Sequence, residues 1–490
     1  MTDHTPGIDA ALFFGAAPTA TTPAQSARRG RGRLKAALVP ACLVLAGCAS
    51  APLENVDLPT RAAIAAPITA LPAMKTFPDF APVPPQRSNR DIARDFLDLS
   101  FALESGRPLP RMSRFEGPIT VHVEGNPPPT LIPDLDRVLT RLRREAGLDI
   151  RRVPGAQASV TVAPVPRAEI RRFLPKAACF VVPNVSGADE YRRARRGGTT
   201  SWSNLTRRER VTIFVPSDSA PQEIRDCLNE ELAQAIGPLN DLYRLPDSIF
   251  NDDNVQSVLT GFDMLVLRAY YAPELRPGMT REEVAARLPP ILSRLNPAGD
   301  SIPSRPLAAT PRAWIEAIQT ALGPGTDMTA RRNAARSALA IAQRRGWHDH
   351  RLAFSHVALG RLTQATDPKF AERQFAAADA IYSRTPGTAL HRAFTASQLA
   401  AAAISRGQGA EALRLLGPHL ATAKRYQNAA LLATLMMLKS EALALEGRAA
   451  EARAVRLDSL GWARYGFGED RAVRARQREI AALSPLANKG

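Results

Sequence analysis

The stretch Cys227-Leu228-Asn229-Glu230-Glu231-Leu232-Ala233-Gln234-Ala235-Ile236-Gly237 decides the fold of this chain. It predicts the second half of a helix, because Ser219 and Gln222 have the spacing of a capping box and Gly237-Pro238 ends the pattern. At about 100° per residue, an apolar stripe forms from Ile224, Leu228, Leu232 and Ala235. Glu231 lies beside this stripe, so we expect its carboxylate to need a partner or a raised pKa.

Short strands and helices surround this helix and predict an α+β domain. Alternating apolar residues predict strands over residues 119–123, 159–162, 179–182 and 211–215. Helices are expected from Ser88, which has capping-box spacing to Asp91, and over residues 135–146. The basic, glycine-containing stretch from Arg192 to Arg208 is interpreted as a solvated loop in preference to a binding lid.

A helix of this kind after several strands resembles the core of zincin metallopeptidases. In zincins, His-Glu-x-x-His on one helix binds zinc and activates water, and an extended form adds x-x-Gly-x-x-His. Glu231 and Gly237 match this pattern, but Glu230, Gln234 and Asn240 stand at the three ligand positions. Ser248-Ile249-Phe250-Asn251 resembles the turn beneath the metal in metzincins, with Phe250 in place of methionine. The resemblance implies a retained scaffold with replaced ligands.

Longer motifs narrow the resemblance to one family. Four stretches are similar to a bacterial lipoprotein family catalogued as domain of unknown function 2927. They are Ser88-Asn89-Arg90-Asp91-Ile92, Arg114-Phe115-Glu116-Gly117-Pro118, the residues from Cys227 through Asp241 and those from Pro246 through Asp252. The similarity covers about residues 88–285. It implies an architecture and a compartment, with no established reaction.

The candidate remnant active site consists of Glu230, Glu231, Gln234, Asn240 and Asp241. Zinc prefers His nitrogen and Cys sulfur, which these residues lack, so we expect no metal and no cofactor. One alternative is an oxygen-only site for a harder cation, built from Glu230, Asp241, Asp252, Asp253 and Asn254. Another is a metal-free acid–base pair, Glu230 or Glu231 with Asp241. We favour a hydrogen-bonded network in which carboxylates and amides replace the bonds to zinc.

The N-terminal region predicts secretion and lipid attachment. Basic residues from Arg28 to Lys35 precede a short apolar segment that ends in Leu45-Ala46-Gly47-Cys48, which resembles a bacterial lipobox. About a dozen apolar residues are too few to span a membrane. The resemblance implies cleavage before Cys48 and acylation of Cys48, and Ala49 resembles the next residue of proteins sent to the outer membrane. We therefore expect a lipoprotein anchored in the outer membrane and facing the periplasm.

The remaining cysteines agree with an oxidising compartment. The chain has four cysteines, of which Cys42 leaves with the signal and Cys48 carries lipid. Cys179 and Cys227 are left as an even pair, for which we expect a disulfide bond. Two buried free thiols are the alternative.

The charge is strongly basic. The formal net charge is +17, and it is +14 for residues 48–490. Because secretion separates the protein from DNA and RNA, we expect no nucleic-acid partner. Phospholipid headgroups and anionic envelope polymers are acidic partners within reach.

The C-terminal part predicts a helical repeat region. From about Pro311 the chain is rich in alanine and arginine, and Gly407 with Ala410-Glu411-Ala412 recurs as Gly447 with Ala450-Glu451-Ala452, an offset of 40 residues. Small residues at this spacing resemble tetratricopeptide-like (TPR-like) helix pairs, which present a binding groove. An irregular helical bundle is the alternative.

The expected domains are a signal peptide (1–47), a lipidated Pro/Ala-rich tether (48–87), a zincin-like α+β domain (88–288), a Pro-rich linker (289–311) and an all-α TPR-like region (312–490). The expected function is that of an envelope lipoprotein whose degenerate peptidase domain is non-catalytic and whose helical repeats bind a protein, peptide or envelope polymer. The alternative is a peptidase or glycan hydrolase that uses Glu231 and Asp241 on an envelope polymer. Whether the chain is an enzyme stays open, with the balance against it.

Overall fold

The computed structural model describes residues 70–78, 80–155 and 157–489. The predicted signal peptide, Cys48 and residues 49–69 of the predicted tether lie outside the described residues. None of the helices in the described part is both long enough and apolar enough to span a membrane.

An α/β part comes first and contains a five-stranded sheet in the order β2-β1-β3-β5-β4. β1 pairs in parallel with β2 and β3, and β3 pairs in parallel with β5. β4 is an antiparallel edge strand on β5. The sheet is therefore mixed and largely parallel. Parallel strands need crossover connections, and helices provide most of them here. The strands are β1 (Ile119–Val123), β2 (Ile150–Arg152), β3 (Val160–Val165), β4 (Phe180–Pro183) and β5 (Val211–Pro216).

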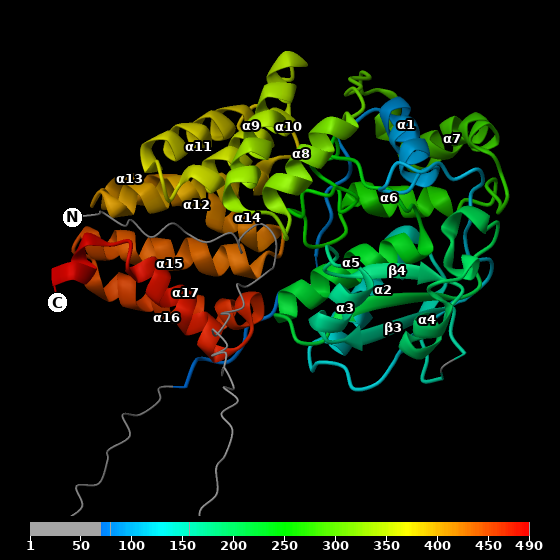
Figure 1. Cartoon of the computed structure of the whole chain (residues 1–490), viewed down its shortest axis with the longest axis horizontal. Helices are drawn as coiled ribbons and strands as arrows, with labels where there is room; N and C mark the ends of the chain where they lie inside the picture. Colours follow the sequence, from blue (N-terminus) through cyan, green and yellow to red (C-terminus); the bar gives the residue numbers. More distant parts are fainter. Residues whose placement is uncertain (1–69, 79, 156, 490) are drawn as a thin grey trace, which may run out of the picture. The chain divides into compact units, whose positions relative to one another are not determined.

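Helices cover both faces of this sheet (Figure 1). Residues alternate along β3, so that Val160 and Val162 enter the core with α2 (Leu131–Ala146) and α5 (Pro221–Ile236). Ala163 and Val165 point to the other face, where α3 (Arg167–Phe173) and α4 (Ala188–Ala194) pack. The four predicted strands are therefore present as β1, β3, β4 and β5, and the predicted helix that contains Glu231 is α5. The sequence did not predict β2, α3 and α4.

The ends of several elements differ from the predicted ends. Ser88 caps α1 as predicted, since its side chain accepts from the N–H of Asp91. The predicted capping box on α5 is wrong: its N-cap is Ala220, and no side chain caps it. The reason is that Ser219 accepts a hydrogen bond from Arg167, while Gln222 accepts one from the N–H of Ala430 at 2.9 Å.

The predicted Pro-rich linker begins too early. Pro289 and Pro290 lie inside α7 (Arg281–Leu295). The helix continues past them because Leu288, Ile291 and Leu292 are fully buried in the α/β core, which offsets the backbone hydrogen bonds that proline removes. A short 3₁₀ turn (Pro297–Asp300) follows, and residues 301–311 have no regular structure.

The described end of the predicted tether also packs onto the protein. Lys75 donates its backbone N–H to the carbonyl of Gly461 at 3.0 Å, and the Phe77 ring stacks on Trp462 with centroids 4.6 Å apart. Phe77 and Phe80 are buried, because the transfer of an aromatic ring out of water is favourable. Residues 71–78 and Phe80 thus belong to the folded protein.

The remaining described residues are helical and follow the predicted offset of 40 residues. α12 and α15 each have 17 residues, and Gly407 and Gly447 follow them with φ of +72° and +73°. Glycine fits this left-handed conformation without a Cβ penalty.

Among the described residues, two further helices belong to the α/β part and ten to the helical part. In the α/β part they are α1 (Asn89–Ser100) and α6 (Gly261–Tyr270). In the helical part they are α8 (Arg312–Leu322), α9 (Met328–Arg344), α10 (His350–Thr363), α11 (Pro368–Tyr382), α12 (Ala389–Ser405), α13 (Gly409–Leu416), α14 (His419–Arg425), α15 (Ala429–Leu445), α16 (Ala449–Phe467) and α17 (Asp470–Ala481).

Polar contacts join the two parts. The described residues from Leu71 onward belong to one compact unit. Tyr465 of α16 donates to Asp134 of α2 at 2.9 Å, and His391 of α12 lies 2.8 Å from Asp253. Both of these carboxylates are buried, so each contact satisfies a group that would otherwise be costly to desolvate.

Candidate functional site

The end of α5 brings the predicted site residues into the protein interior. Glu231 is 5% exposed and Gln234 is 4% exposed, whereas Glu230 is half-buried. α5 ends at Gly237, where a Cβ would lie 2.5 Å from Leu267 of α6 and 2.9 Å from the carbonyl of Ala233. Only glycine allows this close approach, which fixes where the chain leaves the helix.

Carboxylates from three segments meet near this helix end. Glu104 comes from the loop after α1, Glu230 and Glu231 from α5, and Asp241 and Asp252 from the segment between α5 and α6. Gln234 connects two of these segments, because its Nε2 lies 3.4 Å from Glu104 Oε1 and 3.3 Å from Asp241 Oδ2. We call Glu104, Glu230, Glu231, Asp241 and Asp252 the carboxylate cluster.

Burial and mutual repulsion raise the pKa values in the carboxylate cluster. Burial and the charges of Glu104 and Asp252 raise the pKa of Glu230 to about 8. The pKa values of Glu231 and Asp241 lie well above the ordinary range, first because of burial and then because of neighbouring carboxylates. Burial and the charge of Asp252 also raise the pKa of Glu104. At neutral pH the cluster therefore holds protons.

Two buried oxygens of the carboxylate cluster have no hydrogen-bond partner among the described residues. They are Glu231 Oε2 and Asp241 Oδ1, and both atoms are buried. Each orphaned atom costs about 1–3 kcal/mol of folding free energy. The expected hydrogen-bonded network is thus incomplete, because these two oxygens lack partners. The carboxyls of the cluster are also not all ionised.

Asn240, at the third zincin ligand position, points elsewhere. Its Nδ2 donates to the backbone carbonyl of Asp98 in α1 at 2.9 Å. Gln234 and Asn240 therefore both donate amide hydrogens to oxygen acceptors, which leaves only their carbonyl oxygens with lone pairs. The turn that contains Ser248 and Phe250 is buried, and Ser248 Oγ donates to Asp263 at 2.5 Å.

The expected oxygen-only cation site is not assembled. Asp253 turns toward the helical part and accepts from His391, and Asn254 is exposed with φ of +55°. Among the described residues, no group of three or more His, Cys, Asp or Glu side chains is placed to hold a metal ion. The prediction that joined Asp253 and Asn254 to Glu230 is wrong, because Asp253 binds His391 and Asn254 faces solvent.

The helical part reaches the carboxylate cluster through α8. Gln319 donates to Asp252 Oδ2 at 3.1 Å, and Tyr243 donates to the same oxygen at 2.9 Å. Arg312 donates to the backbone carbonyl of Glu104 at 3.1 Å. The sequence did not indicate these contacts, because nothing in its local pattern pairs residues so far apart.

Arg208 supports the end of α5 and was also missed. This arginine is 2% exposed and donates to the carbonyls of Gln234, Ala235 and Gly237 at 2.6–2.8 Å. These are orphan carbonyls of a helix C-terminus, so the guanidinium both satisfies them and complements the helix dipole. Its position at the end of a basic loop gave no sequence signal for burial.

The expected disulfide between Cys179 and Cys227 is present. It joins the residue before β4 to the middle of α5 across 48 residues of chain. The bond fixes the helix that carries Glu230 and Glu231 to the edge strand of the sheet.

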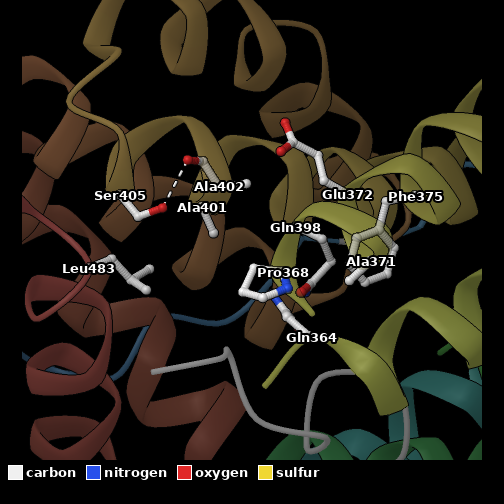
Figure 2. A pocket seen from close by; sticks show the side chains of 10 residues that line it. All are labelled: Gln364, Pro368, Ala371, Glu372, Phe375, Gln398, Ala401, Ala402, Ser405 and Leu483. Atoms are coloured by element: carbon white, nitrogen blue, oxygen red, sulfur yellow. Dashed lines mark hydrogen bonds between the residues drawn. The ribbon is translucent and has the colours of Figure 1, made fainter. Parts of the chain in front are cut away.

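A separate small cavity lies in the helical part (Figure 2). Its volume is about 50 Å³, and Gln398 of α12 points into it beside Pro368 of α11. Gln398 is 3% exposed, and its Oε1 has no hydrogen-bond partner among the described residues. The cavity is lined by Gln364, Pro368, Ala371, Glu372, Phe375, Gln398, Ala401, Ala402, Ser405 and Leu483.

Comparison with known proteins identifies one family. Residues 89–290 match the family model described as "Protein of unknown function (DUF2927)". This range agrees with the resemblance that the sequence motifs indicated. No curated protein and no solved structure matches the chain.

Proposed function

With residues 89–290 being a domain of the DUF2927 family, we propose that this chain is a lipid-anchored binding protein of the bacterial cell envelope. Its α/β domain is a zincin-like scaffold without zinc chemistry, and its TPR-like helices hold a protein partner. The lipobox at Cys48 supports the anchor, and the Cys179–Cys227 bond is compatible with an oxidising compartment.

The observation that carries the proposal is the orientation of two amides. Gln234 and Asn240, at the positions of two zinc ligands, donate hydrogens to Glu104, Asp241 and the carbonyl of Asp98. Each is already committed to an oxygen acceptor. The unpartnered oxygens of Glu231 and Asp241 then favour a ligand that supplies hydrogen-bond donors, such as a peptide or an amide-bearing envelope polymer.

The test uses protein isolated from bacterial membranes without chelators. We expect less than stoichiometric zinc by native mass spectrometry and no cleavage of a peptide library, before or after zinc is added. Photo-crosslinking in intact cells from the rim of the cavity beside Gln398 should capture one protein partner. One zinc per chain together with peptidase activity that Glu231→Gln abolishes would overturn the proposal.

The second candidate function is hydrolysis of an envelope polymer. Glu231 and Asp241 favour it, because both have raised pKa values and each has a buried oxygen without a hydrogen-bond partner among the described residues. Metal-free cleavage of peptidoglycan fragments would support this candidate if it is lost in both Glu231→Gln and Asp241→Asn. The binding proposal requires that no such cleavage occurs.

A further inference from the structure

Two short helices on the sheet face opposite α5 converge at their C-terminal ends. The Phe173 ring at the end of α3 packs edge-on against Tyr191 of α4, with centroids 5.0 Å apart. Arg192 of α4 donates to Glu169 of α3 at 3.0 Å, and the Arg195 guanidinium lies 5.6 Å from the centre of the Phe173 ring. The C-terminal ends of α3 and α4 therefore lie against each other at the protein surface.

This surface carries unpaired positive charge. Arg171, Arg172, Lys176, Arg193 and Arg196 are all exposed. In the described part of the chain none of these five side chains is in an ion pair, although the neighbouring Arg192 pairs with both Glu169 and Asp189. We call these five residues the α3–α4 basic surface.

An apolar side chain stands within the α3–α4 basic surface. Leu174 directly follows α3, between Arg172 and Lys176, and is 42% exposed. It is followed by the exposed Pro175. An exposed leucine leaves apolar surface in contact with water. Insertion into the headgroup layer of a membrane would bury that surface.

Helix stabilisation accounts for only part of this pattern. Arg171, Arg172 and Arg193 lie in the last turns of their helices, where cations complement the helix dipole. Lys176 and Arg196 lie beyond the helix ends, and the exposure of Leu174 has no role in capping. The helix dipole therefore does not account for Lys176, Arg196 or Leu174.

We propose that the α3–α4 basic surface binds anionic phospholipid headgroups, with Leu174 inserted between them. Five unpaired cations match a negatively charged lipid surface, and each contributes to attraction within a Debye length. A polyanion in solution, such as a nucleic acid, would use the arginines but has no apolar layer for Leu174. The inference is independent of any ligand at the carboxylate cluster.

The test measures amide hydrogen exchange of the full chain, as isolated from cells, mixed with lipid vesicles. Vesicles of phosphatidylglycerol and phosphatidylethanolamine should slow exchange in residues 171–176 and 192–197 at least about tenfold relative to phosphatidylcholine vesicles. The protection should disappear at high salt. Equal protection by both vesicle types, or none by either, would overturn the proposal.

Two sets of variants separate the surface from general basicity. Arg171→Gln/Arg172→Gln/Arg193→Gln/Arg196→Gln should abolish the protection. The control, Arg344→Gln/Arg345→Gln/Arg453→Gln/Arg471→Gln, has the same net charge but changes exposed arginines elsewhere, and should keep it. Equal loss in both sets would contradict a specific surface.

Leu174→Ser separates lipid from other polyanions. It should weaken protection by vesicles several-fold and leave protection by inorganic polyphosphate unchanged. If polyphosphate protects these residues as strongly as vesicles do, and Leu174→Ser affects both equally, the surface binds polyanions and the lipid proposal is wrong.

Discussion

Glu231 holds a buried carboxyl that has an orphaned oxygen and acidic neighbours. Helical spacing predicted that Glu231 is partly removed from water, because it placed this residue beside the apolar stripe of α5, but it did not predict the orphaned oxygen. It could not indicate that Glu104 and Asp252 join the carboxylate cluster, since these residues come from loops remote in sequence. Asn240 was expected beside Gln234, and its turn toward Asp98 depends on the path of the chain after Gly237.

At the same scale, Glu230→Gln should change how stability depends on pH. The unfolded side chain ionises above its ordinary pKa of 4.5, but burial and nearby acids keep it protonated in the folded protein to about pH 8. Unfolding therefore releases a proton in this window, and the free energy of unfolding falls as pH rises. Glu230→Gln should be more stable than wild type by about 1–3 kcal/mol at pH 8 and no more stable at pH 4, measured by urea unfolding. The same difference at both pH values would contradict the raised pKa.

Arg208 gives a second prediction for a single residue. Arg208→Met should lower the free energy of unfolding by about 3–5 kcal/mol, because it orphans three carbonyls at the end of α5. Arg207→Met is the matched control, since Arg207 is exposed and pairs with Glu116 at the surface. It should cost about 0–1 kcal/mol. Similar losses in the two variants would show that Arg208 does not support the helix.

At the scale of the element, periodicity predicted four strands and α5 but not their partners. β2 and α4 are short and rich in charged residues, so their apolar faces are too brief to form a recognisable pattern. α7 runs through two prolines because buried residues on either side hold it. Local rules therefore failed where long-range packing decided the outcome.

The disulfide leads to a prediction about α5. Cys179→Ala/Cys227→Ala should lower the free energy of unfolding by about 3–4 kcal/mol, because the bond no longer restricts the unfolded chain. Guanidinium unfolding of wild type under reducing conditions should show the same loss. An unchanged stability in both experiments would mean that packing alone holds α5 to the sheet.

At the scale of the whole molecule, the two parts share buried polar contacts. Asp253 and His391 are buried together, as are Asp134 and Tyr465, and each pair joins the α/β part to the helices. Separation of the parts would leave these groups without partners. We therefore expect a single calorimetric transition for the full chain, and a lower, broader transition for Asp253→Asn. Two independent transitions in wild type would show that the parts fold separately.

The central claim of the proposed function is that protonated acids and hydrogen-bonded amides stand at the positions that resemble the metal ligands of zincins. Infrared difference spectroscopy can observe the carbonyl band of a protonated carboxylic acid directly. At neutral pH we predict such a band in wild type, a weaker band in Glu231→Gln because Glu230 and Asp241 keep their protons, and no change when zinc is added. An ionised Glu231 at neutral pH, with a spectrum that shifts on addition of zinc, would contradict the account.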